Sequence, residues 1–164
     1  MRKIVICLFL SVSAFIYSCT NTEEPALTAP TNIQDKSTDM FAGQVIESKK
    51  EMEDGIEVWE VKVQNANGAI VRFYWRVDSG VLYEIDGQEV PFNYEVTPGN
   101  GLITYSAAKT QAIAALKNDD LLRWQLEKES DFANKWIYRF EFDDDGSTIR
   151  VFVDASTGDV LEID

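Results

Sequence analysis

The chain has 164 residues, of which 15 are basic and 28 acidic, and it contains no histidine, so its net charge is −13. So acidic a chain repels phosphate backbones, which argues against a nucleic-acid partner. Without histidine, Ser-His-Asp and Cys-His catalysis and any His-bearing zinc site are excluded. These exclusions favour a binding protein over an enzyme, and we predict no cofactor.

The first 18 residues have the layout of a secretory signal peptide. Arg2 and Lys3 form a short positive segment, and an uncharged apolar run follows from residue 4 to residue 17. This run is shorter than the about 20 apolar residues that a membrane-spanning helix needs. A buried core helix is the alternative, but no charged residue interrupts the run. We therefore interpret residues 1–18 as a signal peptide.

The end of this segment resembles the lipobox of bacterial lipoproteins. Residues 16–19 read Ile-Tyr-Ser-Cys, so a small residue, Ser18, precedes the cysteine, although Tyr17 departs from the small residue usual at its position. The resemblance implies cleavage after Ser18 and lipidation of Cys19. The protein would then be anchored in a membrane of the bacterial cell envelope, at the periplasmic face or the cell surface. The alternative is a secreted protein with one unmodified cysteine.

Residues 19–38 are predicted to form a disordered tether between the membrane and the folded domain. The segment is rich in Thr, Asn, Glu and Ala, contains Pro25 and Pro30, and has few apolar residues. A segment of this composition buries too little apolar surface to offset the entropy lost on ordering.

The rest of the chain contains an internal repeat. Trp59 matches Trp136 at an offset of 77 residues, and Gly80 matches Gly158 at an offset of 78. The offset changes at the first hairpin turn, where loop length varies most easily. The repetition predicts two copies of one supersecondary unit.

Each copy is predicted to contain a β-meander, because apolar and polar residues alternate with a period of two. This alternation is found in residues 59–63, 71–77, 136–142 and 149–153. Asn67-Gly68 and Asp145-Gly146 favour tight hairpin turns, since both central positions of such turns need a positive φ. One face of each predicted sheet is apolar and the other is polar.

A short helix is predicted before each meander. In the second copy an alanine-rich helix spans 107–117 with Ser106 as its N-cap. In the first copy the helix is reduced to one or two turns at 39–42. We predict a first repeat at 39–90, a connector at 91–104 and a second repeat at 105–164.

The second copy combines the alanine-rich helix, the strand at 136–142 and an Asp-Ala-Ser-Thr-Gly turn at 154–158 that leads into Val160-Leu161. This combination resembles the PepSY domain. The first copy departs from it, with a degenerate helix and a turn that reads Val-Asp-Ser-Gly at 77–80. The resemblance implies an α+β fold of two PepSY-like repeats, each an antiparallel β-meander with a short helix packed on one face.

The same resemblance implies a non-catalytic binding module, because PepSY domains occur in the propeptides of secreted metallopeptidases and in envelope proteins, where peptidase inhibition has been proposed. It assigns no catalytic residue. We therefore expect a protein partner, either a secreted peptidase that is bound or inhibited or another envelope protein. The alternative is a structural or accessory lipoprotein that contacts an envelope polymer or a membrane protein.

The acidic run at 143–146 is similar to the start of a calcium-binding loop. If Glu141 took the first ligand position, the twelfth would be Phe152, which cannot bind calcium. The first copy has Asn-Ala-Asn-Gly in the equivalent place, at 65–68. We favour a hairpin turn and predict no metal site.

Five basic residues occupy alternating positions on the predicted polar face: Lys62, Arg72, Arg76, Arg139 and Arg150. They could bind a carboxylate-bearing partner. We favour the alternative that they pair with cross-strand carboxylates such as Glu60 and Glu141.

The four tryptophans lie on predicted strands, where core packing is favoured over a ligand cage. Apart from lipid attachment at Cys19, the sequence assigns no binding residue.

Overall fold

The computed structural model describes residues 27–88 and 90–164. Its first half contains helix α1 (Thr31–Met40) and four strands: β1 (Gln44–Glu53), β2 (Ile56–Gln64), β3 (Ile70–Arg76) and β4 (Leu82–Gly87). Its second half contains helix α2 (Tyr105–Leu116), a short 3-10 turn (Ser130–Phe132) and four strands: β5 (Leu121–Glu129), β6 (Lys135–Asp144), β7 (Ser147–Asp154) and β8 (Val160–Ile163). One helix followed by four strands therefore occurs twice.

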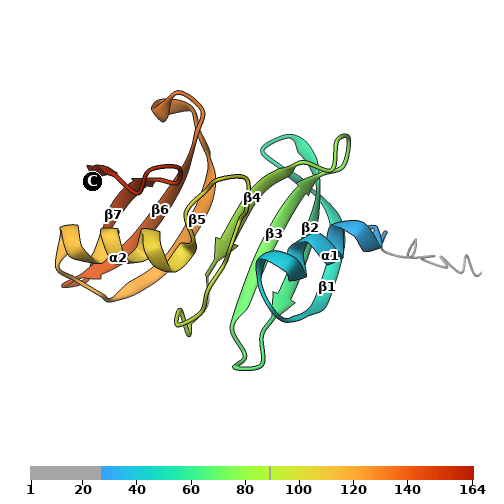
Figure 1. The fold of residues 1–164 in the computed structure, drawn as a ribbon, viewed down its shortest axis with the longest axis horizontal. Coiled ribbons are helices and arrows are strands. Elements are labelled where there is room, and N and C mark those ends of the chain that lie inside the picture. Colours follow the sequence, from blue (N-terminus) through green and yellow to red (C-terminus); the bar gives the residue numbers. More distant parts are fainter. Residues whose placement is uncertain (1–26, 89) are drawn as a thin grey trace, which may run out of the picture.

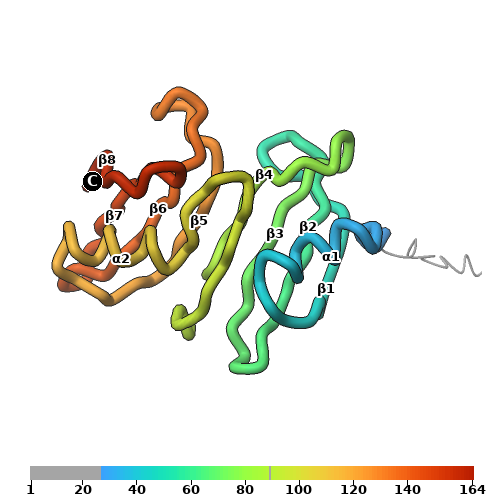
Figure 2. Tube along the Cα trace, viewed as in Figure 1, coloured from blue at the N-terminus to red at the C-terminus, as the bar shows by residue number. Residues whose placement is uncertain are grey.

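All eight strands form a single antiparallel sheet in chain order, from β1 at one edge to β8 at the other. Both helices lie on the same face of this sheet (Figures 1 and 2). Helix α1 contacts β1 and β2, and helix α2 contacts β6, β7 and β8. The protein thus has the predicted α+β fold, in which each meander has one helix on its apolar face.

The hairpin turns follow from local sequence. Asp145 and Gly146 have φ angles of 50° and 86°, and Gly68 has a φ angle of 85°. In the second repeat the Asp143 side chain accepts a hydrogen bond from the Gly146 N–H, with a distance of 2.8 Å. The acidic run is thus a turn between β6 and β7. Among the described residues, no cluster of three or more Cys, Asp or Glu is arranged to hold a metal ion.

One continuous core joins the two repeats, and the connector belongs to it. Trp124 of β5 is fully buried, and its indole Nε1 donates a hydrogen bond of 2.8 Å to the hydroxyl of Tyr94 in the connector. The Tyr94 ring stacks on Tyr105 of α2 at 5.1 Å and meets the edge of Phe41, just after α1, at 5.2 Å. The connector therefore links both helices through aromatic contacts.

The structure corrects the predicted tether. Residues 31–38 are the first turns of α1, and within them Ile33 and Ser37 are buried. The Ser37 hydroxyl accepts a hydrogen bond of 2.9 Å from the indole of Trp75. The prediction of disorder was wrong for this part because two residues four apart suffice to seat one side of a short helix on the sheet. Residues 19–26 lie outside the described residues.

The predicted helix boundaries also need correction. In the first repeat, α1 ends where the sequence placed the helix, at 39–42, so most of it was missed. In the second repeat the N-cap is Thr104, whose hydroxyl accepts from the Ala107 N–H, and not Ser106. Ser106 lies in the first turn and its hydroxyl bonds to Glu95 of the connector. The Ser106 hydroxyl is thus engaged in a tertiary contact, and the cap is formed by Thr104 two residues upstream.

Within the described part of the chain, no helix is both long enough and apolar enough to cross a bilayer. The predicted signal peptide and Cys19 lie outside the described residues. The remaining domain boundaries stay predictions.

Candidate binding site at the seam between the repeats

The two repeats meet at a seam between β4 and β5. Its ladder consists of four residue pairs, from Glu84 opposite Glu127 to Gly87 opposite Trp124. The pairing of β4 with β5 ends at the pair Glu84–Glu127. Both strands continue beyond this pair, β4 to Leu82 and β5 to Glu129, but they no longer pair with each other there. The strand ends therefore diverge, and the seam is open at this end.

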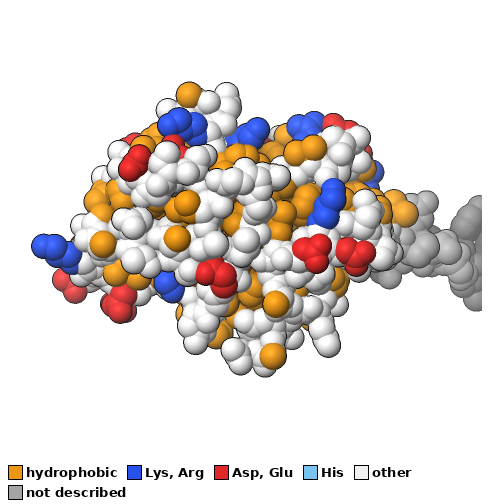
Figure 3. Space-filling model, in the orientation of Figure 1, with side chains coloured by type: hydrophobic (Ala, Val, Ile, Leu, Met, Phe, Trp, Pro, Cys, Tyr) orange, Lys and Arg blue, Asp and Glu red, His pale blue; other side chains and the backbone are white. Residues whose placement is uncertain are grey.

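The open end of the seam is hollowed on the face that carries the helices. This hollow has a volume of about 570 Å³, and its walls come from α1, the β3–β4 turn, residues 97–100, β5 and β6. Its apolar lining includes Met40, Val81, Trp75 and Trp136. On this face, hydrophobic side chains reach the surface between the two helices (Figure 3). The hollow therefore offers a partner exposed apolar surface.

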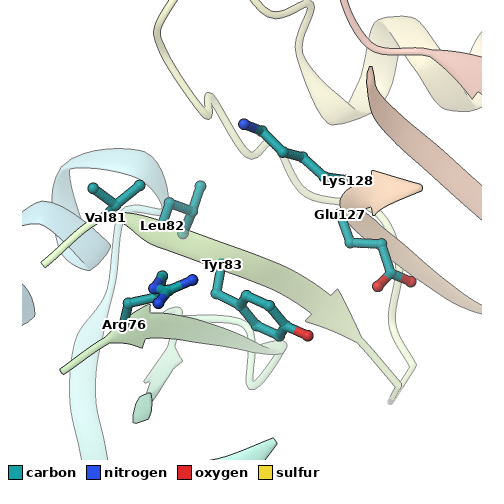
Figure 4. Close-up of a pocket in the computed structure, with 6 residues that line it drawn as sticks. All are labelled: Arg76, Val81, Leu82, Tyr83, Glu127 and Lys128. Carbon is teal, nitrogen blue, oxygen red and sulfur yellow. The ribbon is translucent and has the colours of Figure 1, made fainter. Parts of the chain in front are cut away.

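A second hollow, of about 270 Å³, adjoins the first and shares Val81, Leu82 and Lys128 with it. Figure 4 shows Arg76 and Leu82 on one side of the gap, and Glu127 and Lys128 on β5 across from them. We name the two hollows together the seam groove. The first repeat supplies one wall of the groove and the second repeat supplies the other.

Two lysines of the seam groove lie over tryptophan rings, one in each repeat. Lys36 Nζ is 5.3 Å from the centre of the Trp75 ring, and Lys128 Nζ is 5.7 Å from that of Trp136. Both distances fit cation–π contacts. Lys36 also donates a hydrogen bond of 3.3 Å to the backbone oxygen of Gly80. Among the described residues, neither lysine has a carboxylate within ion-pair distance.

The basic residues that the sequence singled out behave differently, because each has an acidic partner. On the face without helices, Lys62 pairs with Glu47 at 2.8 Å. Of the others, Arg72 lies 3.4 Å from Asp86, Arg139 lies 3.3 Å from Glu129, Arg150 lies 3.5 Å from Glu141 and Arg76 lies 2.7 Å from Asp78. The interpretation as cross-strand ion pairs is confirmed for Lys62, Arg72, Arg139 and Arg150, whereas Arg76 pairs with Asp78 in the turn that follows its own strand. These pairs leave little free positive charge on that face for a carboxylate-bearing partner.

Buried carboxylates lie beside the seam on the same face. Glu84 is 5 % exposed and accepts a hydrogen bond of 2.8 Å from the side chain of Gln125. Burial, and then the negative charge of the cross-strand residue Glu127, raise the pKa of Glu84 to about 7. Burial also raises the pKa of Asp86 and that of Glu127 from their ordinary values. Ionised carboxylates are therefore costly at this seam.

The structure confirms one expectation about the tryptophans and shows what sequence reasoning missed. Trp75 and Trp124 are buried, and Trp59 and Trp136 pack against the core, so the expected packing role holds.

The seam groove itself was not predicted. Nothing in the sequence pattern distinguishes its two lysines, because Lys36 lies in the segment predicted to be a tether and Lys128 lies near the end of a strand.

The second repeat has the element order and the turn expected of one known family. Residues 102–164 match the family model described as "PepSY: Peptidase propeptide and YPEB domain". The second repeat is therefore similar to the PepSY domain over its whole length. The match runs from the residues before α2 to the end of β8, so the matched residues include Lys128 and Trp136 of the seam groove.

Two further comparisons give little more. No curated protein matches the chain. The crystal structure of a candidate lipoprotein from Clostridium difficile 630 aligns with 87 % of this chain and 95 % of its own, at 16 % identity and a TM-score of 0.39. The PepSY match is therefore the finding on which a function can be based.

Proposed function

We propose that this protein is a non-catalytic binding module of the bacterial cell envelope, and that it binds or inhibits a secreted peptidase. The PepSY match of residues 102–164 carries this proposal, since the family is described by its occurrence in peptidase propeptides. The seam groove supports it as well, because it is a hollow with an apolar lining and polar groups of the kind that ligands occupy.

The side chains of the molecule also support binding over catalysis. The chain has no histidine to serve as a general base near neutral pH. Glu84 and Glu127, whose pKa values are raised by burial, lie on the face of the sheet without helices, where each contacts a side chain of a neighbouring strand. Glu84 accepts from Gln125, and Glu127 lies 3.4 Å from Arg139. These contacts give the buried carboxylates a structural role.

We propose that Cys19 carries lipid and holds the domain close to the membrane. Ala29 is 3 % exposed and its N–H donates to the Ser48 hydroxyl at 3.3 Å, so the folded domain begins near residue 29. Ten residues of chain span at most about 35 Å. A lipid on Cys19 would therefore keep the first repeat within about that distance of the bilayer surface, a shorter reach than the predicted tether of 19–38 allows.

Substitution of Cys19 tests the anchor. We expect Cys19→Ala to move the protein from the membrane fraction to the soluble fraction and to remove the acyl mass from the mature chain, because stable anchoring needs the buried acyl chains. The matched control is Cys7→Ala, which removes the other cysteine and lies inside the predicted signal peptide. Fractionation and intact-protein mass spectrometry provide the measurement. A Cys19→Ala protein that stays in the membrane with unchanged mass contradicts the proposal.

The peptidase proposal is tested with the mature chain, residues 19–164, added to the secreted fraction of its own host. We expect the peptidase activity of that fraction to fall, and a peptidase to be recovered with the immobilised chain. If no peptidase is recovered and no activity falls across a panel of secreted metallopeptidases, the proposal is wrong. Recovery of an envelope polymer or a membrane protein in its place would favour the accessory role.

A further inference from the structure

We propose that the seam groove binds an extended segment of the protein partner, and that a carboxylate of that segment is held by Lys36 and Lys128. Apolar residues beside the carboxylate would pack on Met40, Val81 and Trp136. This inference rests on the proposed function, since it assumes that the partner is a protein, and it adds the surface and the chemistry of recognition.

Charge is the first support. Among the described residues, four basic side chains have no ion pair: Lys36, Lys109, Lys117 and Lys128. Two of these four line the same hollow, one from each repeat. The chain has 28 acidic residues, yet none of the described ones pairs with these two lysines. Two unpaired cations that line one hollow can bind a negatively charged group of a ligand.

The acidic residues of the groove do not neutralise these lysines. Glu127 lies 3.4 Å from Arg139, on the face of the sheet without helices. Asp39 lines the larger hollow but lies beyond ion-pair distance from Lys36. The third cation of the groove, Arg76, is already paired with Asp78 at 2.7 Å. Lys36 and Lys128 are therefore the charges that remain for a ligand.

The tryptophan rings place the two ammonium groups beside apolar surface. Lys36 lies over Trp75 and is also held by the Gly80 backbone oxygen, and Lys128 lies over Trp136. A lysine whose ammonium group is already held over a ring loses less freedom when it binds an anion. Trp136, which is half-buried, and Val81, which is 56 % exposed, provide contact surface for apolar side chains. A carboxylate flanked by apolar residues matches both features.

The diverging strands indicate that the ligand is extended. The β4–β5 ladder ends at Glu84 and Glu127. On the side that faces the seam, Leu82 of β4 and Lys128 of β5 therefore have no ladder partner. Unpaired strand ends bind extended segments, whose backbone continues the ladder. The two adjoining hollows have volumes of about 570 and 270 Å³, and the groove crosses from the helix face to the opposite face between them. That path suits several residues in extended conformation.

The test selects ligands from a random ten-residue peptide display library with the immobilised mature chain. We expect the selected peptides to be enriched in Asp or Glu next to apolar residues, and to bind less tightly as salt is raised. In Lys36→Gln/Lys128→Gln, the affinity of a selected peptide should fall about tenfold. Lys117→Gln, which removes a cation that also lacks an ion pair, should leave it unchanged. Selected peptides made with a free or an amidated C-terminus distinguish a side-chain carboxylate from a terminal one.

Several results would overturn the inference. These are the absence of any selected peptide, selection of basic or uncharged peptides, and an equal loss of affinity in the Lys117→Gln control. The result can be separated from the proposed function by peptidase recovery. If wild type and Lys36→Gln/Lys128→Gln recover the same peptidase equally well, the protein binds a peptidase as proposed, but the seam groove is not the surface that binds it. If wild type recovers none, the proposed function itself fails.

Discussion

Gly87→Ala is expected to destabilise the protein by about 2–3 kcal/mol, because it inserts a methyl group into the closed end of the seam. Gly87 lies opposite Trp124 in the β4–β5 ladder. A Cβ at this position would overlap the indole nitrogen of Trp124 and the hydroxyl of Tyr94. These two groups share the hydrogen bond that ties the connector to β5, so neither can move without loss of that bond. We expect a melting temperature about 5–10 °C lower.

Trp124→Phe provides the control for this prediction, since it removes the indole nitrogen that the new methyl group would meet. The double variant Gly87→Ala/Trp124→Phe should lose less stability than the sum of the two single variants, because contacting residues are coupled. Urea unfolding of the four proteins gives the comparison. An unchanged midpoint in Gly87→Ala, or strict additivity in the double variant, would show that the close approach at the seam is unimportant.

Glu84→Gln is expected to stabilise the protein at pH 8 by roughly 2–3 kcal/mol and to have little effect near pH 5. The pKa of Glu84 is raised to about 7, above the usual carboxyl value, so the folded state holds a proton that the unfolded state has released. The contribution of Glu84 to the free energy of unfolding is therefore fully present below about pH 4.5, and it is lost as the pH rises through about 7, where the folded protein must ionise this buried carboxyl group. Glutamine keeps the neutral form at every pH and can still accept from Gln125.

The measurement is the free energy of unfolding at pH 5 and at pH 8. Glu57→Gln serves as the control, because Glu57 is 56 % exposed and makes a surface ion pair with Lys50. We expect wild type to lose stability between pH 5 and pH 8, and Glu84→Gln to lose less. Equal losses in wild type and Glu84→Gln would mean that Glu84 ionises in the folded state without cost. Asp86 and Glu127 act in the same direction, since burial raises the pKa of each.

Local chemistry made the strands and their turns predictable. The period-two alternation in 71–77 and 136–142 corresponds to β3 and β6, because one face of each strand packs on the core. Asp145 and Gly146 form a hairpin turn in which both residues have the expected positive φ, whereas in the turn at 65–68 only Gly68 has one. There the Asn65 side chain accepts hydrogen bonds from the N–H groups of Asn67 and Ala69. The cross-strand ion pairs of Lys62, Arg72, Arg139 and Arg150 also followed from the alternating positions of these residues, but the pairing of Arg76 with Asp78 in the next turn did not.

The first helix and the course of the connector could not be predicted in this way. Helix α1 has a polar composition, and its place in the fold depends on Ile33 in the core and on a hydrogen bond from Trp75, 38 residues away, to Ser37. The connector looked like a boundary because of its prolines and glycines. It is instead held by stacking of Tyr94 on Tyr105 and by the bond from Trp124. No local pattern encodes such long-range contacts.

The sequence by itself determined the net charge and excluded histidine chemistry. It also determined the predicted signal peptide with its lipidation site at Cys19, the internal repeat, and the PepSY-like character of the second copy. All of these depend on residue type and short-range spacing. Only the tertiary structure decided that the two repeats share one sheet and one core, and that the seam between them opens into a groove. The groove brings Lys36 within reach of the surface that also holds Lys128, which is 92 residues further along the chain. That juxtaposition arises where the β4–β5 ladder ends, and ladder length depends on packing across the whole sheet.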